Sequence, residues 1–251
     1  MSGHSKWATI KRKKGAADAK RGQLFTRLTR EIVMSAREGG GDPDSNFRLR
    51  LAIDKAKAQS MPKENIDRAI KRATGEGKEG EVYEEVLYEG YAPNGIAVII
   101  ECVTENRNRT VAEVRHLLTR SGGNLGELGS VAWQFKRAAT FSFPSEKYNF
   151  DQIFELAVEG GADDVTEEDG EITVVAPVES FKTLSDRFRA ANMMPDEAGL
   201  SMIPNTEMEL SVDDTLQVMR TIENLEELDD VQNVYSNMKI SEEAMAAIES
   251  E

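Results

Sequence analysis

The chain has 251 residues, of which 39% are hydrophobic and 30% charged, and its formal net charge is -14. No apolar run approaches the roughly 20 residues that a membrane-spanning helix needs, no signal-peptide pattern is present, and the single cysteine, Cys102, excludes an internal disulfide bond and fits a reducing compartment. We therefore expect a cytoplasmic protein without a membrane partner, long enough for two or three small domains.

Charge is divided unevenly along the chain. Residues 1–78 contain 19 Lys and Arg against 9 Asp and Glu, whereas residues 79–251 contain 12 against 36, so the two parts carry net charges of +10 and -24. A contrast of this size within one chain indicates a basic module that meets a polyanion. The acidic remainder would keep the protein soluble and limit non-specific association.

The basic part is predicted to form three short helices. Each has an apolar stripe at helical spacing, and the glycines at 39–41 and Pro62 separate the three segments. The stripes are Phe25, Leu28 and Ile32, then Leu49, Ala52, Ile53 and Ala56, then Ile66, Ala69, Ile70 and Ala73. Helices with one apolar face each bury those faces most simply against one another. We predict a three-helix bundle within a basic domain of residues 1–77.

Cations in this domain are the candidate nucleic-acid contacts. Four adjacent cations occupy positions 11–14, and on a helical wheel Arg27 and Arg30 lie roughly opposite the first apolar stripe. Neutralisation of phosphates by such residues releases counterions and gives sequence-independent affinity. The candidates are Lys6, Lys11, Arg12, Lys13, Lys14, Lys20, Arg21, Arg27 and Arg30. The alternative is that the charge run is only a solvated face, but its contrast with the acidic remainder favours nucleic acid.

The acidic part is predicted to contain two α/β units. Strands are expected at 82–91, 95–103 and 131–136, with a helix within 106–120. Residues 138–204 then hold a complete β-α-β-β-α-β set, the ferredoxin-like pattern, and the tail adds one helix and one strand. A lone helix and strand cannot form a domain, so the tail is expected to complete the first unit.

The predicted fold is therefore α+β, a three-helix bundle followed by two α/β domains with ferredoxin-like β-α-β topology, one inserted in the other. The domains are residues 1–77, residues 78–136 plus 205–240, and the inserted residues 137–204. Within the insertion, Asp169-Gly170 predicts a hairpin. The first inserted helix is expected to bury one face made by Ile153, Phe154, Ala157 and Val158.

Motifs for catalysis are mostly absent. The only histidines are His4 and His116, so with one cysteine no zinc site of His and Cys can form, and no nucleophile elbow occurs. The glycine-rich stretch SGGNLGELGS matches neither dinucleotide-binding nor P-loop spacing. A cluster of carboxylates on adjacent strands could hold magnesium, although such side chains more often face solvent. These are Glu84, Glu85, Glu89 and Glu101. We predict no catalytic residue, metal or cofactor, and no enzymatic activity.

A second candidate for binding anions lies in the stretch TENRNRT at residues 104–110. Arg107 and Arg109 stand where a strand is followed by a helix, and helix N-termini bind anions. Asn and Thr are also ordinary N-caps, which is the default interpretation of this stretch.

Several short stretches together resemble the YebC family of bacterial proteins, which includes the quinolone-signal regulator PmpR and a mitochondrial translational activator of cytochrome oxidase. The stretches, within residues 3–125, are GHSKW, KRG, GGGDP, Pro62 with Ile66 to Ile70, YEGY, NRNRT and GGNL. The resemblance implies a helical bundle, two α/β domains of which one is discontinuous, and a non-enzymatic regulatory role. Bacterial members are described as DNA-binding transcriptional regulators, and others act in translation at the ribosome.

Three interpretations of function stay open. The first is a DNA-binding transcriptional regulator, the second a ribosome- or RNA-associated translation factor, and the third a protein-interaction scaffold that uses the acidic domains. No helix-turn-helix or RNA-recognition signature is present in the basic module. The sequence predicts neither the oligomeric state nor the target.

Overall fold

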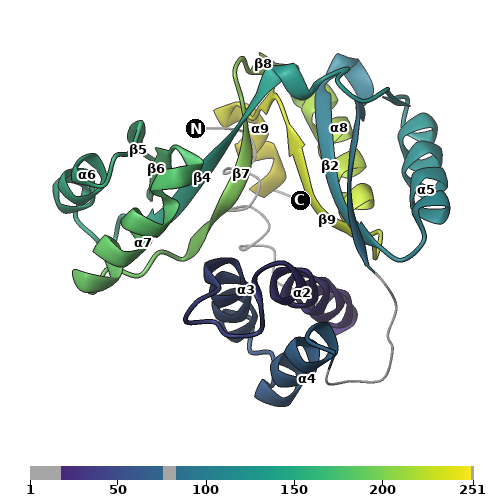
Figure 1. Ribbon diagram of the computed structural model, residues 1–251. Helices are drawn as coiled ribbons and strands as arrows, with labels where there is room; N and C mark the ends of the chain where they lie inside the picture. Colours follow the sequence, from purple (N-terminus) through teal and green to yellow (C-terminus); the bar gives the residue numbers. More distant parts are fainter. Residues whose placement is uncertain (1–17, 76–82, 250–251) are drawn as a thin grey trace. The chain divides into compact units, whose positions relative to one another are not determined.

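The computed structural model describes residues 18–75 and 83–249 (Figure 1). Residues 135–203 form one compact unit, and most of the remaining chain forms another. Helices and antiparallel sheets are both present, with a helical region at the N-terminal side, so the predicted α+β class is confirmed.

The N-terminal region consists of α2 (Asp18–Gly39), α3 (Phe47–Ala58) and α4 (Lys63–Ala73). Their apolar stripes meet in one core, as the sequence predicts. The fully or nearly fully buried members are Leu28, Ile32, Val33, Ala36, Leu49, Ala52, Ile53, Ala56, Met61, Ile66 and Ala69. Because each helix alone would leave its stripe in water, burial against the other two holds the bundle together.

The turn between α2 and α3 is organised by Asn46. Its side-chain oxygen accepts a hydrogen bond from Leu49 N (3.0 Å) and so caps α3, while its amide donates to the carbonyl oxygens of Ser35 and Gly40, each at 2.7 Å. The side chain needs the space beside Gly39, where an added Cβ would lie 2.7 Å from it. Gly39, which ends α2, is therefore required by this cap.

A second sheet-containing region follows, with strand order β3-β1-β2-β9. Its strands are β1 (Glu84–Tyr91), β2 (Ala97–Thr104), β3 (Asn124–Leu125) and β9 (Val231–Ser236). The tail strand β9 pairs antiparallel with β2, with Ile99 opposite Tyr235. Two short strands, β8 (Met208–Glu209) and β10 (Met238–Lys239), pair in parallel beside it. The tail thus adds its strand to the sheet that the earlier segment begins.

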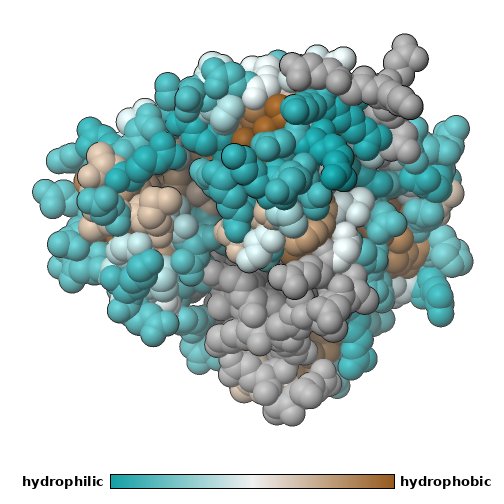
Figure 2. Space-filling view, turned by 90° about the horizontal axis from the view of Figure 1, so that it is seen from below, coloured by the Kyte–Doolittle hydropathy of each residue, from teal (hydrophilic) through white to brown (hydrophobic). Residues whose placement is uncertain are grey.

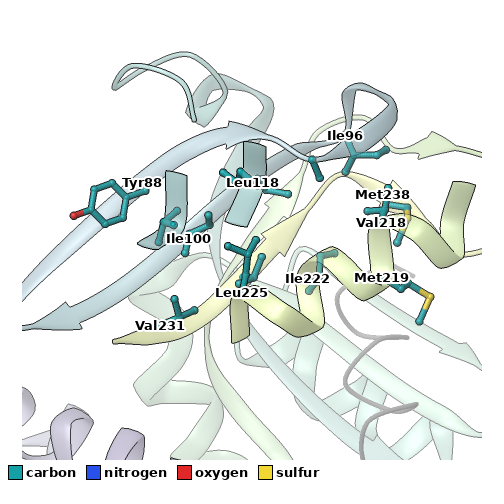
Figure 3. Close-up of a cluster of buried hydrophobic side chains, with 14 of the residues drawn as sticks. Tyr88, Ile96, Ile100, Leu118, Val218, Met219, Ile222, Leu225, Val231 and Met238 are labelled. Carbon is teal, nitrogen blue, oxygen red and sulfur yellow. The ribbon is translucent and has the colours of Figure 1, made fainter. Parts of the chain in front are cut away.

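The same region shares one apolar core between distant segments (Figure 3). Side chains of β1 and β2 meet those of α5 (Arg107–Arg120), α8 (Val212–Glu226) and β9, and α9 (Glu242–Glu249) adds Ala244. The labelled members in Figure 3 include Tyr88, Ile100, Leu118, Ile222 and Leu225. Neither segment has enough apolar surface to close this core alone, which explains why the tail returns to it.

Residues 135–203 have the predicted β-α-β-β-α-β order. The elements are β4 (Phe135–Pro144), α6 (Phe150–Glu159), β5 (Asp164–Glu168), β6 (Glu171–Ala176), α7 (Phe181–Ala190) and β7 (Glu197–Pro204). The sheet order β5-β6-β4-β7 is that of a ferredoxin-like fold. Asp169 and Gly170 join β5 to β6 with φ of 51° and 80°, the conformation that favours this dipeptide.

Two local predictions are wrong. The strand expected at 131–136 is a short 3-10 turn, η2 (Ala132–Gln134), and a single long strand begins at Phe135. On α6, Ile153 and Ala157 are buried as expected, but Phe154 and Val158 are 46% and 54% exposed. A helix turns 100° per residue, so neighbours of a central buried pair lie at the edge of the packed face.

Hydrophilic residues predominate on the face in Figure 2, where apolar areas are small and separate. Among the helices of residues 18–75 and 83–249, none is long and apolar enough to cross a membrane.

Candidate nucleic-acid interface

The predicted basic contacts fall into two groups. Lys6, Lys11, Arg12, Lys13 and Lys14 lie outside the described residues. Lys20 and Arg21 stand in the first turn of α2, and Arg27 and Arg30 follow on the same helix. Only the last two have described side chains.

The two described arginines contact the end of α8 and the turn that follows it. Arg27 Nη1 donates to the carbonyl oxygen of Glu226 (3.4 Å), and Gln23 Nε2 donates to that of Glu227 (3.3 Å). Arg30 donates to the carbonyl of Asp229. The last carbonyls of a helix lack partners within the helix and carry partial negative charge, so cationic donors are favourable there. The side of α2 opposite its core stripe is therefore used for packing.

Arg30 is the clearest departure from the sequence prediction. It is only 7% exposed, its Nη2 lies 3.1 Å from Asp230 Oδ1, and its guanidinium lies over the ring of Tyr83. In this arrangement Arg30 is not presented to a phosphate, and we remove it from the candidate contacts. The helical wheel places it opposite the apolar stripe correctly, but that side of α2 faces protein.

Asp230 collects donors from three segments. Its buried carboxylate accepts from Thr110 Oγ1 (2.6 Å), Thr104 Oγ1 (3.0 Å) and Arg109 Nη2 (3.0 Å), besides pairing with Arg30. Burial by itself opposes ionisation, but the hydrogen bonds from Thr110, Arg109 and Thr104 and the charge of Arg30 outweigh it and hold the pKa of Asp230 below its ordinary value. Asp230 therefore links α2, β2 and α5 as an anion.

The contacts of Asp230 also define the surroundings of Arg107 and Arg109, the second candidate site for binding anions. Asn106 caps α5 by accepting from Arg109 N (3.1 Å), so the default interpretation of this stretch is confirmed. The guanidinium of Arg109 is already paired with Asp230 and lies 3.6 Å from Glu105, and these contacts raise its pKa, first through the hydrogen bond and charge of Asp230. Arg107 remains exposed at the helix start.

Other exposed cations lie on α4. Lys63, Arg68 and Lys71 are exposed, and among the described residues no carboxylate lies within ion-pair distance of them. The sequence places Arg68 and Lys71 opposite the third stripe but gives no reason to choose them over solvated charges.

Three of the four carboxylates considered for magnesium have separate partners. Glu101 accepts from Asn233 (3.0 Å) and Tyr235 (3.1 Å), and Glu85 pairs with Arg48. Glu89 accepts from three backbone amides. Among the described residues no group of three or more His, Cys, Asp and Glu could hold a metal ion. The magnesium hypothesis therefore has no geometric support within the described part of the chain.

Glu89 has a structural role that the sequence did not suggest. Its buried carboxylate accepts from Gly129 N (2.7 Å), Val131 N (2.8 Å) and Ala132 N (2.7 Å). Burial opposes ionisation here too, but the three amide hydrogen bonds prevail and lower the pKa of Glu89. This explains why Val131 and Ala132 do not extend a strand: their amides bind the side chain of Glu89. The loop that Glu89 fixes exposes Leu128 and Trp133.

Cys102 is not activated as a nucleophile. Cys102 lies buried in β2, where desolvation, followed by the charges of Asp230 and Glu101, raises the pKa of its thiol to about 12. His116 is exposed on α5. A thiol that stays protonated is a poor nucleophile, so Cys102 is a small buried hydrophobe.

A basic helical bundle, a sheet completed by the chain's tail and a ferredoxin-like unit define the class of this molecule as a multi-domain α+β protein. Two family profiles match it. Residues 5–76 match the N-terminal domain of TACO1/YebC proteins, and residues 83–238 match their second and third domains. The chain belongs to the TACO1/YebC family, as its sequence motifs predict.

Relatives match along their whole length. A protein of Geotalea uraniireducens is 51% identical over 245 residues, covering 98% of both chains, and one of Chlorobaculum parvum is 51% identical over 252 residues, covering both completely. Each is named a probable transcriptional regulatory protein. Among solved structures, a conserved hypothetical protein from Aquifex aeolicus is 40% identical, with a TM-score of 0.83 over 90% of this chain and 93% of that one.

Proposed function

We propose that this protein is a non-enzymatic regulator that acts in the cytoplasm, binds DNA and controls transcription, with its basic N-terminal module in contact with phosphates. The observation that carries the proposal is the charge contrast, +10 in residues 1–78 against -24 in the remainder. The names of the relatives, probable transcriptional regulatory proteins, support the regulatory role.

The contacts are assigned to the N-terminal end of the module. Most of the assigned cations precede the part of α2 that packs on α8: Lys6, Lys11, Arg12, Lys13, Lys14, Lys20 and Arg21. Arg27 is also assigned, as a half-buried residue of that part of α2. Lys63, Arg68 and Lys71 of α4 are further candidates because they are exposed and no described carboxylate pairs with them. Arg30 and Arg109 are left out because Asp230 already neutralises them.

Contacts of this kind bind without reading sequence. Each neutralised phosphate releases a counterion, so affinity falls steeply with salt, and phosphate contacts fix register rather than base identity. The acidic remainder repels nucleic acid, which would restrict binding to the basic module. Specificity for a target gene would then have to come from a partner or from DNA shape.

A translation factor bound to RNA or the ribosome is the second candidate. The same phosphate chemistry serves RNA, and the resemblance includes a translational activator. A protein-interaction scaffold that uses the acidic domains is the third. These alternatives differ in the polyanion that is preferred, or in whether one is bound at all.

The test is a salt titration of binding to a DNA duplex and to a ribosomal RNA fragment. If about five cations neutralise phosphates on a duplex, log affinity should fall against log salt with a slope of roughly -4 to -5. Changing Lys11, Arg12, Lys13 and Lys14 together to Ala should flatten the slope and weaken all DNA sequences about equally. The control changes Lys182 and Arg189, two exposed cations within residues 135–203, to Ala.

The outcomes separate the candidates. An unchanged slope in the quadruple variant would show that the run is only a solvated face. A loss of affinity in the quadruple variant that is confined to RNA would favour a translation factor over a transcriptional regulator. If the protein binds neither nucleic acid, the protein-interaction scaffold is the remaining candidate function.

A further inference from the structure

One flank of α6, beside its buried face, carries an apolar ridge. Phe150, Phe154 and Val158 recur every four residues and therefore lie on one side of the helix. The rings of Phe150 and Phe154 are 5.9 Å apart, so the ridge is continuous. Phe154 and Val158 are about half exposed although Ile153 and Ala157 already anchor the helix. We call these three residues the α6 ridge.

A row of carboxylates runs beside this ridge. Asp151, Glu155 and Glu159 each follow a ridge residue by one position, so they form a parallel row with the same spacing. Glu159 pairs with Arg187 (2.7 Å), whereas Asp151 and Glu155 have no cationic partner among the described residues. We call these three residues the acidic border.

The acidic border stabilises α6 only at its start, where Asp151 lies in the first turn and the helix dipole favours an anion. Like charges four residues apart repel each other along a helix. Glu159 ends the helix, where the dipole is negative, and the last turn contains no basic residue. Residues 135–203 also contain 14 Asp and Glu against 6 Lys and Arg. The local energetics of the helix account for Asp151 and, through its pair with Arg187, for Glu159, but they give no reason for Glu155 or for the exposed rings.

We propose that the α6 ridge and its acidic border form a docking surface for a basic amphipathic segment of a partner protein. Apolar side chains of the segment would cover Phe150, Phe154 and Val158, and its Lys or Arg would meet Asp151 and Glu155. Recognition of an amphipathic segment by an apolar strip with charges of opposite sign beside it is a recurring mode of binding.

Charge argues against an occupant that is itself acidic. A second copy of the same surface would bring carboxylates against carboxylates, and nucleic acid or an anionic lipid surface would meet the same repulsion. The site is separate from the phosphate contacts proposed above, so either proposal can fail alone.

The experiment uses the full-length protein and a labelled helical peptide of about 18 residues made of Leu and Lys with Leu at helical spacing. One control peptide has the same composition with its Leu residues spread around the helix, and another has Glu in place of Lys. Binding is followed by fluorescence anisotropy. The protein variants are Phe154→Gln with Val158→Gln, and Asp151→Asn with Glu155→Gln. Leu128→Gln, an exposed apolar residue outside residues 135–203, is the matched control.

The amphipathic basic peptide should bind, and each double variant should weaken it by about tenfold or more while Leu128→Gln leaves it unchanged. The changed side chains are exposed, so the variants should melt like the wild type. If the variant Phe154→Gln with Val158→Gln does not fold, the variant Asp151→Asn with Glu155→Gln still tests the proposal. Equal binding of the spread-Leu peptide, or undiminished binding by the variants, would overturn the proposal. So would a concentration-dependent dimer, seen by sedimentation, that the ridge variant abolishes, because the occupant would then be a second copy.

Discussion

Removal of the charge of Asp230 should destabilise the contact between α2 and the region around α5. Asp230→Asn keeps the shape of the side chain and an oxygen that can accept from Thr110 or Thr104. Two arginines lose their partner, but their side chains are 9% exposed for Arg30 and 42% for Arg109. Water can replace the carboxylate at Arg109, where an exposed pair contributes about 0–1 kcal/mol. Water cannot readily replace the carboxylate at the buried Arg30. Breaking a buried ion pair of this kind costs about 3–5 kcal/mol.

The retained hydrogen bonds place the expected loss for Asp230→Asn at the lower end of that range, about 3 kcal/mol in the free energy of unfolding. Urea unfolding followed by circular dichroism measures it, and amide exchange in α5 gives a local readout. Asp229→Asn, which changes an exposed neighbour, is the matched control. In a double-mutant cycle with Arg30→Met, the two changes should couple by about 1–3 kcal/mol, because each removes the reason for burying the other group.

The pH dependence has a definite sign. The pKa of Asp230 is lowered in the folded protein, so its ionised form contributes stability above the unfolded value of about 3.9, and this contribution is lost as pH falls through the lower folded pKa. Asp230→Asn should remove this part of the acid sensitivity. An unchanged urea midpoint, or losses for Asp230→Asn and Arg30→Met that simply add, would refute the reasoning that Arg30 depends on this carboxylate.

Two further predictions concern the other structural assignments. Glu89→Gln should lower the free energy of unfolding by about 1–3 kcal/mol and increase amide exchange at residues 129–132, because an amide group offers one accepting oxygen to three N–H donors. The control is Glu127→Gln, which changes an exposed neighbour. Equal amide exchange in the two variants would contradict the prediction. Residues 135–203 expressed alone should give a well-dispersed amide NMR spectrum, because the unit has a complete sheet and its own aromatic core, in which Phe141 lies 4.8 Å from Phe181; a collapsed spectrum would show that it needs the rest of the chain.

Periodicity predicted those parts of the fold that depend on local pattern. The stripes of α2, α3 and α4 and the Asp169-Gly170 hairpin follow from spacing and backbone preference, and all are present. The return of the tail strand to β2 was predictable because a lone helix and strand cannot bury their apolar faces. The α6 face was predicted only in part, because Phe154 and Val158 satisfy the same spacing whether they lie at the centre of the packed face or at its edge.

The charged contacts were less predictable, since they depend on tertiary structure. A helical wheel shows that Arg30 is opposite the stripe of α2 but not that the carbonyl of Asp229, in the turn after α8, meets that side. Asp230 lies about 200 residues further along the chain, and no local pattern joins the two. Glu89 had a detectable signal, since it is a carboxylate within a short strand beside Gly90 and ahead of a glycine-rich loop. Its three amide partners could not be read from that signal.

The placement of charge on α6 opposes helix stability at one position, and this leads to a last prediction. Glu155 lies between Asp151 and Glu159 in a row of like charges. A charge set for folding alone would have the opposite sign at this position. Glu155→Lys, which replaces two repulsive pairs by two attractive ones, should stabilise the protein by about 0.5–1 kcal/mol while weakening its binding of the basic peptide. The urea midpoint and the peptide-binding assay measure the two effects on this variant. A gain in stability with unchanged peptide binding would show that the charge of Glu155 is not there for a partner.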